Sequence, residues 1–179
     1  MQTMTIIPQS SEQAIFFLEQ VGTQENVINH CKAVAKMAEN IAKQVSFTVP
    51  VNIELVIIAS LVHDIGRSES HGIGHAVTGA KIGRELGFTE DVINIIKRHI
   101  GAGIDKTEAI KLGLPPEDYT PKTIEEKIVA HADNLVKGTQ IQTIDQCIKK
   151  LKQQSVDKQI IERIISLHNE LSALSKKPL

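Results

Sequence analysis

The sequence is poor in aromatic residues and in cysteine. Its 179 residues include no tryptophan, one tyrosine and four phenylalanines, and the two cysteines, Cys31 and Cys147, belong to no CxxC pair. Two isolated cysteines in a chain of this length do not make a disulfide framework, and they suit a reducing compartment.

Long apolar runs and an excess of one charge are also missing. No stretch of 18 consecutive apolar residues exists, and the first residues lack the basic and apolar regions of a secretory leader. With 20 basic and 21 acidic residues, the net charge is −1, which argues against membrane association and against a broad nucleic-acid-binding surface. We therefore expect a cytoplasmic protein that binds small ligands, anions included. Assembly into a homo-oligomer is left open.

What the sequence does contain is helical periodicity punctuated by capping residues. Capping-box patterns begin at Ser10 and Thr123, Thr23 is expected to cap the second helix, and Asn52 precedes a segment that is apolar nearly all round, as in a central buried helix. No persuasive strand alternation or hairpin turn is present. We predict an all-α, single-domain helical bundle over residues 1–179, with a proline-rich loop at 112–121. The expected helices lie at about 11–21, 24–45, 52–66, 75–86, 90–100, 124–135, 141–151 and 155–174.

Several polar residues stand at the edge of this expected core. His30 lies on the apolar side of its helix, and His63 and Asp64 close the apolar helix. A histidine and an acid in such a place need a partner, and a metal ion can serve both. Taken singly, His30 reads more readily as a packed core histidine, and Asp133 as a cap or an ion-pair partner.

Read in order, these residues form a family pattern. A helical histidine, His30, comes before the tetrapeptide HDIG that begins at His63, and Asp133 follows inside Ala-Asp-Asn. This order resembles the HD superfamily of metal-dependent phosphohydrolases over about residues 25–137, with an N-terminal helix and two C-terminal helices outside. The resemblance implies that His30, His63, Asp64 and Asp133 bind one metal ion. Two imidazoles and two carboxylates suit Mn, Fe, Co, Ni or Zn better than Ca or Mg.

Two further histidines raise the question of a second ion. In binuclear branches of the superfamily, histidines in the contexts of His75 and His99 bind a second metal ion, and the aspartate of the HD pair, here Asp64, bridges both. In the alternative, His75 only starts a helix and His99 only interacts with a helix C-terminus. One ion is expected and a second is left open. The chain has no GYP motif, so it departs from the HD-GYP phosphodiesterases.

The resemblance implies hydrolysis of a phosphate ester by a metal-activated hydroxide, with Asp64 as the catalytic residue and a nucleotide as the favoured substrate. Arg67, directly after HDIG, and Arg98, beside His99, are candidates for binding the phosphate. The alternative for both is a solvated surface arginine. Two other functions stay open: a di-iron oxygenase of the HD type, and a non-catalytic HD module that binds a nucleotide or a partner protein.

Overall fold

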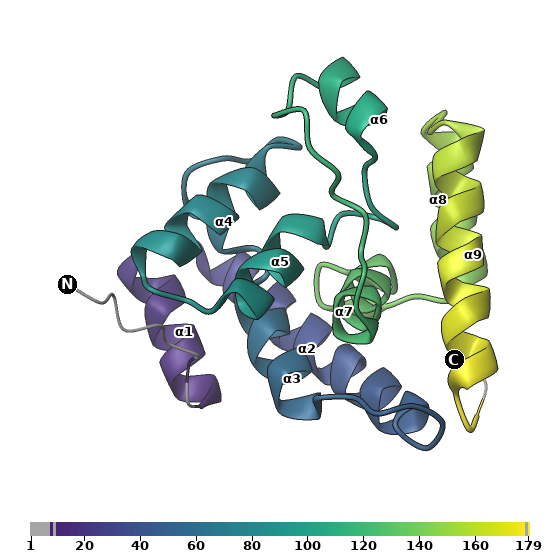
Figure 1. The fold of residues 1–179 in the computed structure, drawn as a ribbon, viewed down its shortest axis with the longest axis horizontal. Helices are drawn as coiled ribbons and strands as arrows, with labels where there is room; N and C mark the ends of the chain where they lie inside the picture. Colours follow the sequence, from purple (N-terminus) through teal and green to yellow (C-terminus); the bar gives the residue numbers. More distant parts are fainter. Residues whose placement is uncertain (1–7, 9, 178) are drawn as a thin grey trace.

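The structure, a computed structural model, describes residue 8, residues 10–177 and residue 179. In these residues the chain forms helices joined by loops (Figure 1), with one small antiparallel hairpin. The expectation of an all-α fold is confirmed. The segment in which the sequence lacks a secretory pattern, residues 1–7, lies outside the described residues.

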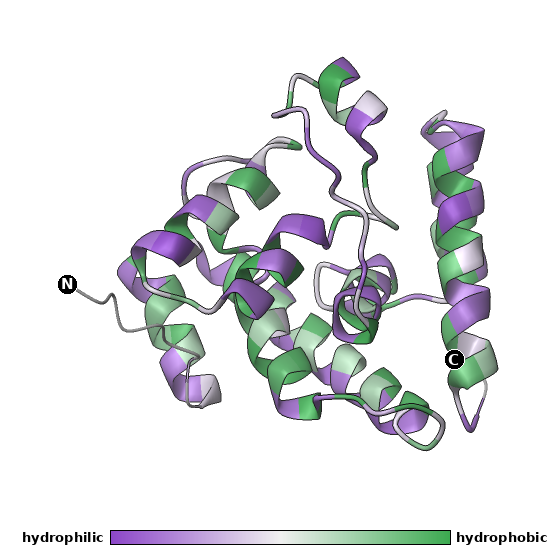
Figure 2. Ribbon diagram, in the orientation of Figure 1, coloured by the Kyte–Doolittle hydropathy of each residue, from purple (hydrophilic) through white to green (hydrophobic). Residues whose placement is uncertain are grey.

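The apolar helix α3 (Ile53–Val62) occupies the centre of the fold. It begins after Asn52, whose side chain accepts a hydrogen bond from the Leu55 backbone N–H at 3.0 Å. Figure 2 shows α3 as strongly hydrophobic, and its neighbours bury it from several sides. These neighbours are α1 (Ser11–Gln20), α2 (Glu25–Val45), α5 (Glu90–Arg98) and α7 (Ile124–Asn134). The prediction of a central buried helix is confirmed.

The end of this helix differs from the expectation. We expected it to continue to Gly66, but α3 ends at Val62 and His63 is its C-cap. The chain turns at Asp64 into a short 3-10 helix, η1 (Ile65–Ser68). Helix α4 (His75–Glu85) packs against η1, and Asp64 lies beside His75, its first residue.

Other boundaries also needed correction. Gln24, rather than Thr23, is the N-cap of α2, and it makes no capping hydrogen bond through its side chain. Helix α6 (Lys106–Lys111) was not expected, although Asp105 and Glu108 form a complete capping box at its start. A six-residue helix offers too few apolar positions for its period to be recognised, so the capping pair was its only signal.

The hairpin was missed as well. Strand β1 (Val136–Lys137) pairs antiparallel with β2 (Gln140–Ile141), and two residues per strand are too few to show alternation. Helix α8 (Ile144–Gln153) therefore begins later than expected, after the strand. Helix α9 (Lys158–Leu174) follows and lies beside α8 at one edge of the molecule (Figure 1).

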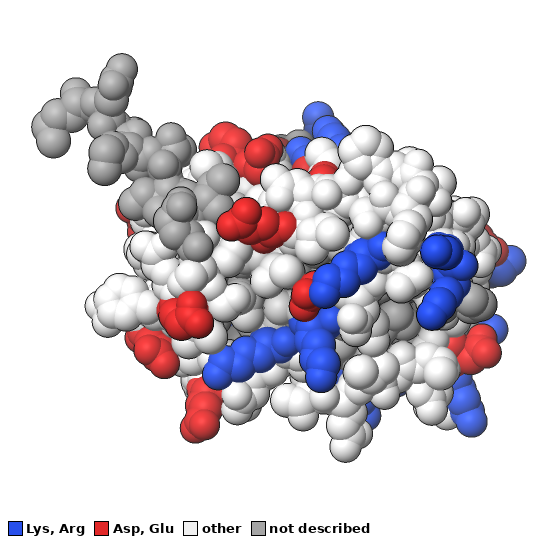
Figure 3. Space-filling model, turned by 90° about the horizontal axis from the view of Figure 1, so that it is seen from below, with Lys and Arg blue, Asp and Glu red and all other residues white. Residues whose placement is uncertain are grey.

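The surface carries charges of both signs. On the face shown in Figure 3, acidic and basic side chains are both present, with uncharged surface between them. Among the helices that the structure describes, none has the length and apolar character required to span a bilayer.

Candidate metal centre

The structure gathers all six residues that the sequence singled out as metal ligands. They come from α2, from the turn after α3, from the first residue of α4, from the C-cap of α5 and from the last turn of α7. Four of them are almost fully buried, and the other two are 17% and 24% exposed through their side chains. The buried ones are His63, Asp64, His75 and His99, and the partly exposed ones are His30 and Asp133.

One half of the cluster surrounds Asp133. Its Oδ1 lies 2.9 Å from His30 Nε2 and 3.6 Å from His63 Nε2. The same two imidazole nitrogens lie 3.9 and 3.8 Å from Oδ2 of Asp64. Two imidazoles and two carboxylates therefore converge here, and His30, His63 and Asp64 offer ligand atoms within 4.8 Å of one another.

The other half of the cluster faces the second oxygen of Asp64. Oδ1 lies 3.0 Å from His75 Nε2 and 3.5 Å from His99 Nε2. The two histidine nitrogens are 3.0 Å apart. The carboxylate of Asp64 thus stands between two pairs of imidazoles and turns one oxygen toward each pair.

Close backbone contact explains how His75 reaches Asp64. A Cβ atom at Gly66 would lie 2.0 Å from the His75 carbonyl oxygen and 2.5 Å from the Gly79 backbone nitrogen. A Cβ at Gly79 would in turn lie 2.8 Å from Cγ2 of Ile96. Glycine at both positions therefore lets η1 approach α4, and lets α4 approach α5, closely enough to bring the two halves together.

Each histidine of the cluster is oriented by its other ring nitrogen. The four Nδ1 atoms lie 2.7–2.8 Å from backbone carbonyl oxygens, which can only accept a hydrogen bond. Nδ1 therefore carries a hydrogen, and each Nε2 faces the cluster, where it can bind an ion, as in protein metal sites. In chain order, the carbonyls are those of Gly138, Ser60, Gly72 and Ile96. Sequence reasoning missed Gly138, because a carbonyl carries no residue-type signal.

The donor atoms fit a bound cation. His63 Nε2 and Asp64 Oδ1 are buried, and neither has a hydrogen-bond partner in the described part of the chain. Two lone pairs at His75 and His99 would repel each other at 3.0 Å unless a positive charge lay beside them. Buried imidazole and carboxylate donors without partners are costly, and a divalent transition metal would satisfy them.

The electrostatics point the same way. Burial would raise the pKa of Asp64 and of Asp133, but the surrounding histidines outweigh it and hold both pKa values well below the usual range. Burial would lower the pKa of His63, but Cys31 and the two aspartates raise it well above the usual value. For His99 burial prevails and lowers the pKa. The centre of the cluster therefore favours positive charge beside ionised carboxylates.

Of the two arginines, the structure brings only Arg67 to the site. Its Nε donates a hydrogen bond to Asp64 Oδ2 at 2.6 Å, and the side chain lines a cavity of about 300 Å³ with His30 and Asp133. Arg98 instead forms an ion pair with Glu126 at 2.7 Å, and both side chains are largely buried. Neither of these two lines the cavity beside the cluster. This buried ion pair is not the solvated surface position that the sequence offered as the alternative to phosphate binding.

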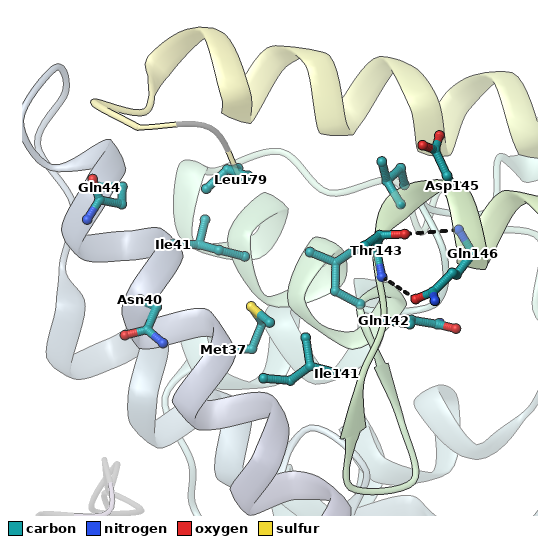
Figure 4. A pocket seen from close by; sticks show the side chains of 12 residues that line it. Met37, Asn40, Ile41, Gln44, Ile141, Gln142, Thr143, Asp145, Gln146 and Leu179 are labelled. Carbon is teal, nitrogen blue, oxygen red and sulfur yellow. Dashed lines mark hydrogen bonds between the residues drawn. The ribbon is translucent and has the colours of Figure 1, made fainter.

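A larger cavity lies elsewhere. It has a volume of about 600 Å³ and lies between α2, the residues after β2 and the start of α8 (Figure 4). Apolar side chains such as Met37 and Ile41 line it together with amides such as Gln142. None of the six clustered residues lines this cavity, whereas His30 and Asp133 line the smaller one.

Comparison with known proteins agrees with the geometry. The family model described as the HD domain matches residues 27–138, which include all six clustered residues. The chain belongs to the HD domain family. Members of this family bind divalent metals, and the His/Asp cluster can hold one.

Similar proteins carry different names. An uncharacterized protein of Methanocaldococcus jannaschii is 51% identical over 167 residues, which cover 92% of this chain and 98% of that relative. A tRNA (cytidine(56)-2′-O)-methyltransferase of Thermoplasma volcanium is 43% identical over 169 residues, which cover 94% of this chain and 48% of the relative. The chain thus spans about half the length of that methyltransferase.

A solved HD domain has the same fold. The HD domain of the Listeria monocytogenes phosphodiesterase PgpH, in complex with cyclic-di-AMP, matches with a TM-score of 0.54 and 19% identity. The match covers 91% of this chain and 98% of that domain.

Proposed function

We propose that this protein is a metal-dependent phosphohydrolase of a nucleotide phosphodiester, built as a single HD domain. One observation carries the proposal: the buried Asp64 carboxylate stands between the imidazole pairs His30/His63 and His75/His99, and turns one oxygen toward each. A carboxylate in this position can bridge two metal ions. We therefore favour a binuclear centre, with Asp133 as the further ligand on the His30 side.

The residues of the site would have different roles in hydrolysis. Metal ions held by the cluster would lower the pKa of water and offset charge on a phosphate oxygen. The Nδ1–carbonyl hydrogen bonds hold the imidazole rings in place, and the low pKa values of Asp64 and Asp133 keep both carboxylates ionised at neutral pH. Arg67 lines the adjoining cavity, where its guanidinium would orient a phosphate by charge-assisted hydrogen bonds.

The names of similar proteins support a nucleotide substrate. A phosphodiesterase HD domain of this fold binds cyclic-di-AMP, and the methyltransferase relative acts on tRNA by its name. The alignment with that relative covers nearly all of this chain but only 48% of the relative. We therefore attribute methyl transfer to the part of the relative that this chain does not span, and phosphodiester hydrolysis to the part that it does.

The test is Asp64→Ala in protein that has been stripped of metal and reloaded with Mn, Fe, Co, Ni or Zn. The expected result is loss of bound metal and a fall of at least about 100-fold in hydrolysis of bis(p-nitrophenyl) phosphate, since even outer-shell changes at metal sites cost about 10–100-fold. Asp91→Ala removes an exposed carboxylate in the first turn of α5 and serves as the control.

Other results would favour the alternatives. Wild-type activity in metal-stripped Asp64→Ala would refute a metal-dependent hydrolase. Oxygen consumption by the iron-loaded protein, without phosphodiester hydrolysis, would indicate the di-iron oxygenase. Nucleotide binding without turnover under any metal would indicate a non-catalytic module.

A further inference from the structure

The cavity beside the proposed metal ligands extends to helix α8. His30, Arg67 and Asp133 line one part of it. Lys137 of β1 and residues of α8, including Lys150, also line it. The hairpin and α8, which sequence reasoning did not connect with the site, therefore help to form its wall.

A second cavity adjoins the first. Its volume is about 380 Å³, and three residues, Lys137, Gln142 and Lys150, line both cavities. Each cavity by itself has a volume near the lower end of the range for ligand pockets, which is about 300–1,000 Å³. A ligand that extends past the shared residues would occupy both.

The second cavity is polar but uncharged apart from the two shared lysines. Its remaining lining consists of Ile141 and side-chain amides. Such amides both donate and accept hydrogen bonds, which suits the edges of a nucleobase and the hydroxyls of a sugar. The amides are those of Gln140, Gln142, Gln146 and Gln153, and Figure 4 shows Gln142 and Gln146 where the chain passes from the hairpin into α8.

The shared border is positively charged although the whole chain has a net charge of −1. Lys137 and Lys150 take part in no ion pair with any residue that the structure describes. Asp133 is the only acid that lines either cavity, and we assign it to the metal. Two cations without acidic partners, at the border of two cavities, favour a bound anion.

We propose that Lys137 and Lys150 bind a second phosphate of the substrate, and that the nucleoside attached to it lies in the glutamine-lined cavity. The substrate class is therefore a dinucleotide, linear or cyclic, rather than a mononucleotide. This rests on the proposed function for the first phosphate, which the metal ligands and Arg67 receive. A mononucleotide would leave the lysine pair and the second cavity without a role.

The experiment compares substrates with one and two phosphates on the metal-loaded enzyme. The probes are diadenylate without a terminal phosphate, 5′-phosphorylated diadenylate and cyclic diadenylate. The two-phosphate probes are expected to have a kcat/KM at least about tenfold higher than the one-phosphate probe, mainly through KM, which corresponds to about 1.4 kcal/mol. Preference between the linear and the cyclic form identifies the source of the second phosphate.

Lysine variants test whether Lys137 and Lys150 cause the preference for two phosphates. Lys137→Gln and Lys150→Gln should each reduce the preference for two phosphates by about tenfold, with partial rescue by Lys150→Arg, because a lost charged hydrogen bond weakens binding by about this factor. Lys149→Gln changes the neighbouring exposed lysine of α8, which lines neither cavity, and should retain the preference.

Binding separates this inference from the proposed function. Calorimetry with a hydrolysis-resistant phosphorothioate diadenylate, with and without its 5′-phosphate, requires no turnover. Tighter binding of the phosphorylated form that is lost in Lys150→Gln supports the subsite even if no hydrolysis occurs. Equal affinity for both forms, or an unchanged preference in both glutamine variants, would overturn it.

Discussion

Replacement of Gly66 by alanine tests whether close packing of η1 on α4 builds the second half of the proposed metal centre. The new methyl group would stand 2.0 Å from the His75 carbonyl oxygen and 2.5 Å from the Gly79 nitrogen, both backbone atoms that cannot rotate away. Carbon contacts are favourable near about 3.5 Å, so the start of α4 has to move by about 1.5 Å. Metal ligands tolerate deviations of only about 0.2 Å, so His75 would no longer share an ion with His99.

We expect two measurable results from Gly66→Ala. Overpacking of this kind costs about 1–3 kcal/mol, and for a chain of this size each kcal/mol lowers Tm by about 2–4 °C. Calorimetric unfolding should therefore show a Tm lower by up to about 12 °C. Elemental analysis should show one ion fewer per chain, because His30, His63 and Asp133 do not depend on α4.

Gly74→Ala is the matched control. Its added Cβ would meet other atoms only at 3.9 Å or beyond, at the N-cap of the same helix, so Tm and metal content should stay near those of the wild type. If Gly66→Ala kept its Tm and its full complement of metal, the argument that glycine is needed for this approach would fail.

Three further predictions address the second ion, the buried arginine and the effect of pH. His75→Ala and His99→Ala should each lower the bound metal by one ion per chain in elemental analysis; unchanged content in both would leave a mononuclear site. Glu126→Ala should lower the free energy of unfolding by about 3 kcal/mol in denaturant, because it leaves Arg98 largely buried without its partner. The KM of the variant should not change. A raised KM at unchanged stability would indicate that Arg98 binds the substrate. Burial lowers the pKa of His131 from 6.5 to about 4, so the unfolded state of the metal-free protein takes up the proton first as the pH falls. The contribution of His131 to stability should be full above pH 6.5 and decline toward pH 4. His131→Gln should therefore remove up to about 3 kcal/mol of the decline in this range, and parallel pH curves for variant and wild type would contradict this.

Helices with long apolar faces were predictable, and short elements were not. The 21 residues of α2 and the apolar segment of α3 carry a periodic or continuous pattern that any folded form must bury. Helix α6 and the hairpin have too few residues for a period to appear. The end of α3 was misjudged because no glycine or proline stands between Val62 and Gly66 to mark it, while η1, which follows Asp64, packs closely on α4.

The identity of the six clustered residues was likewise predictable, because imidazoles and carboxylates beside apolar segments are costly without a partner and their order matched the HD pattern. The arrangement of the two halves of the cluster around Asp64 was not predictable from the sequence. It depends on which oxygen of Asp64 faces which imidazoles, and that follows from the turn after α3.

The sequence by itself determined the helical class, the central apolar helix and the set of side chains gathered at its end, because burial preferences and residue chemistry are local properties. Only the tertiary structure decided that Arg98 pairs with Glu126, and that Lys137 and Lys150 line the same cavity as His30 and Asp133. Those outcomes depend on distances between segments far apart in the chain. Such distances follow from how helices and backbones pack, as at Gly66 and Gly79, and they cannot be predicted from the type of any single residue.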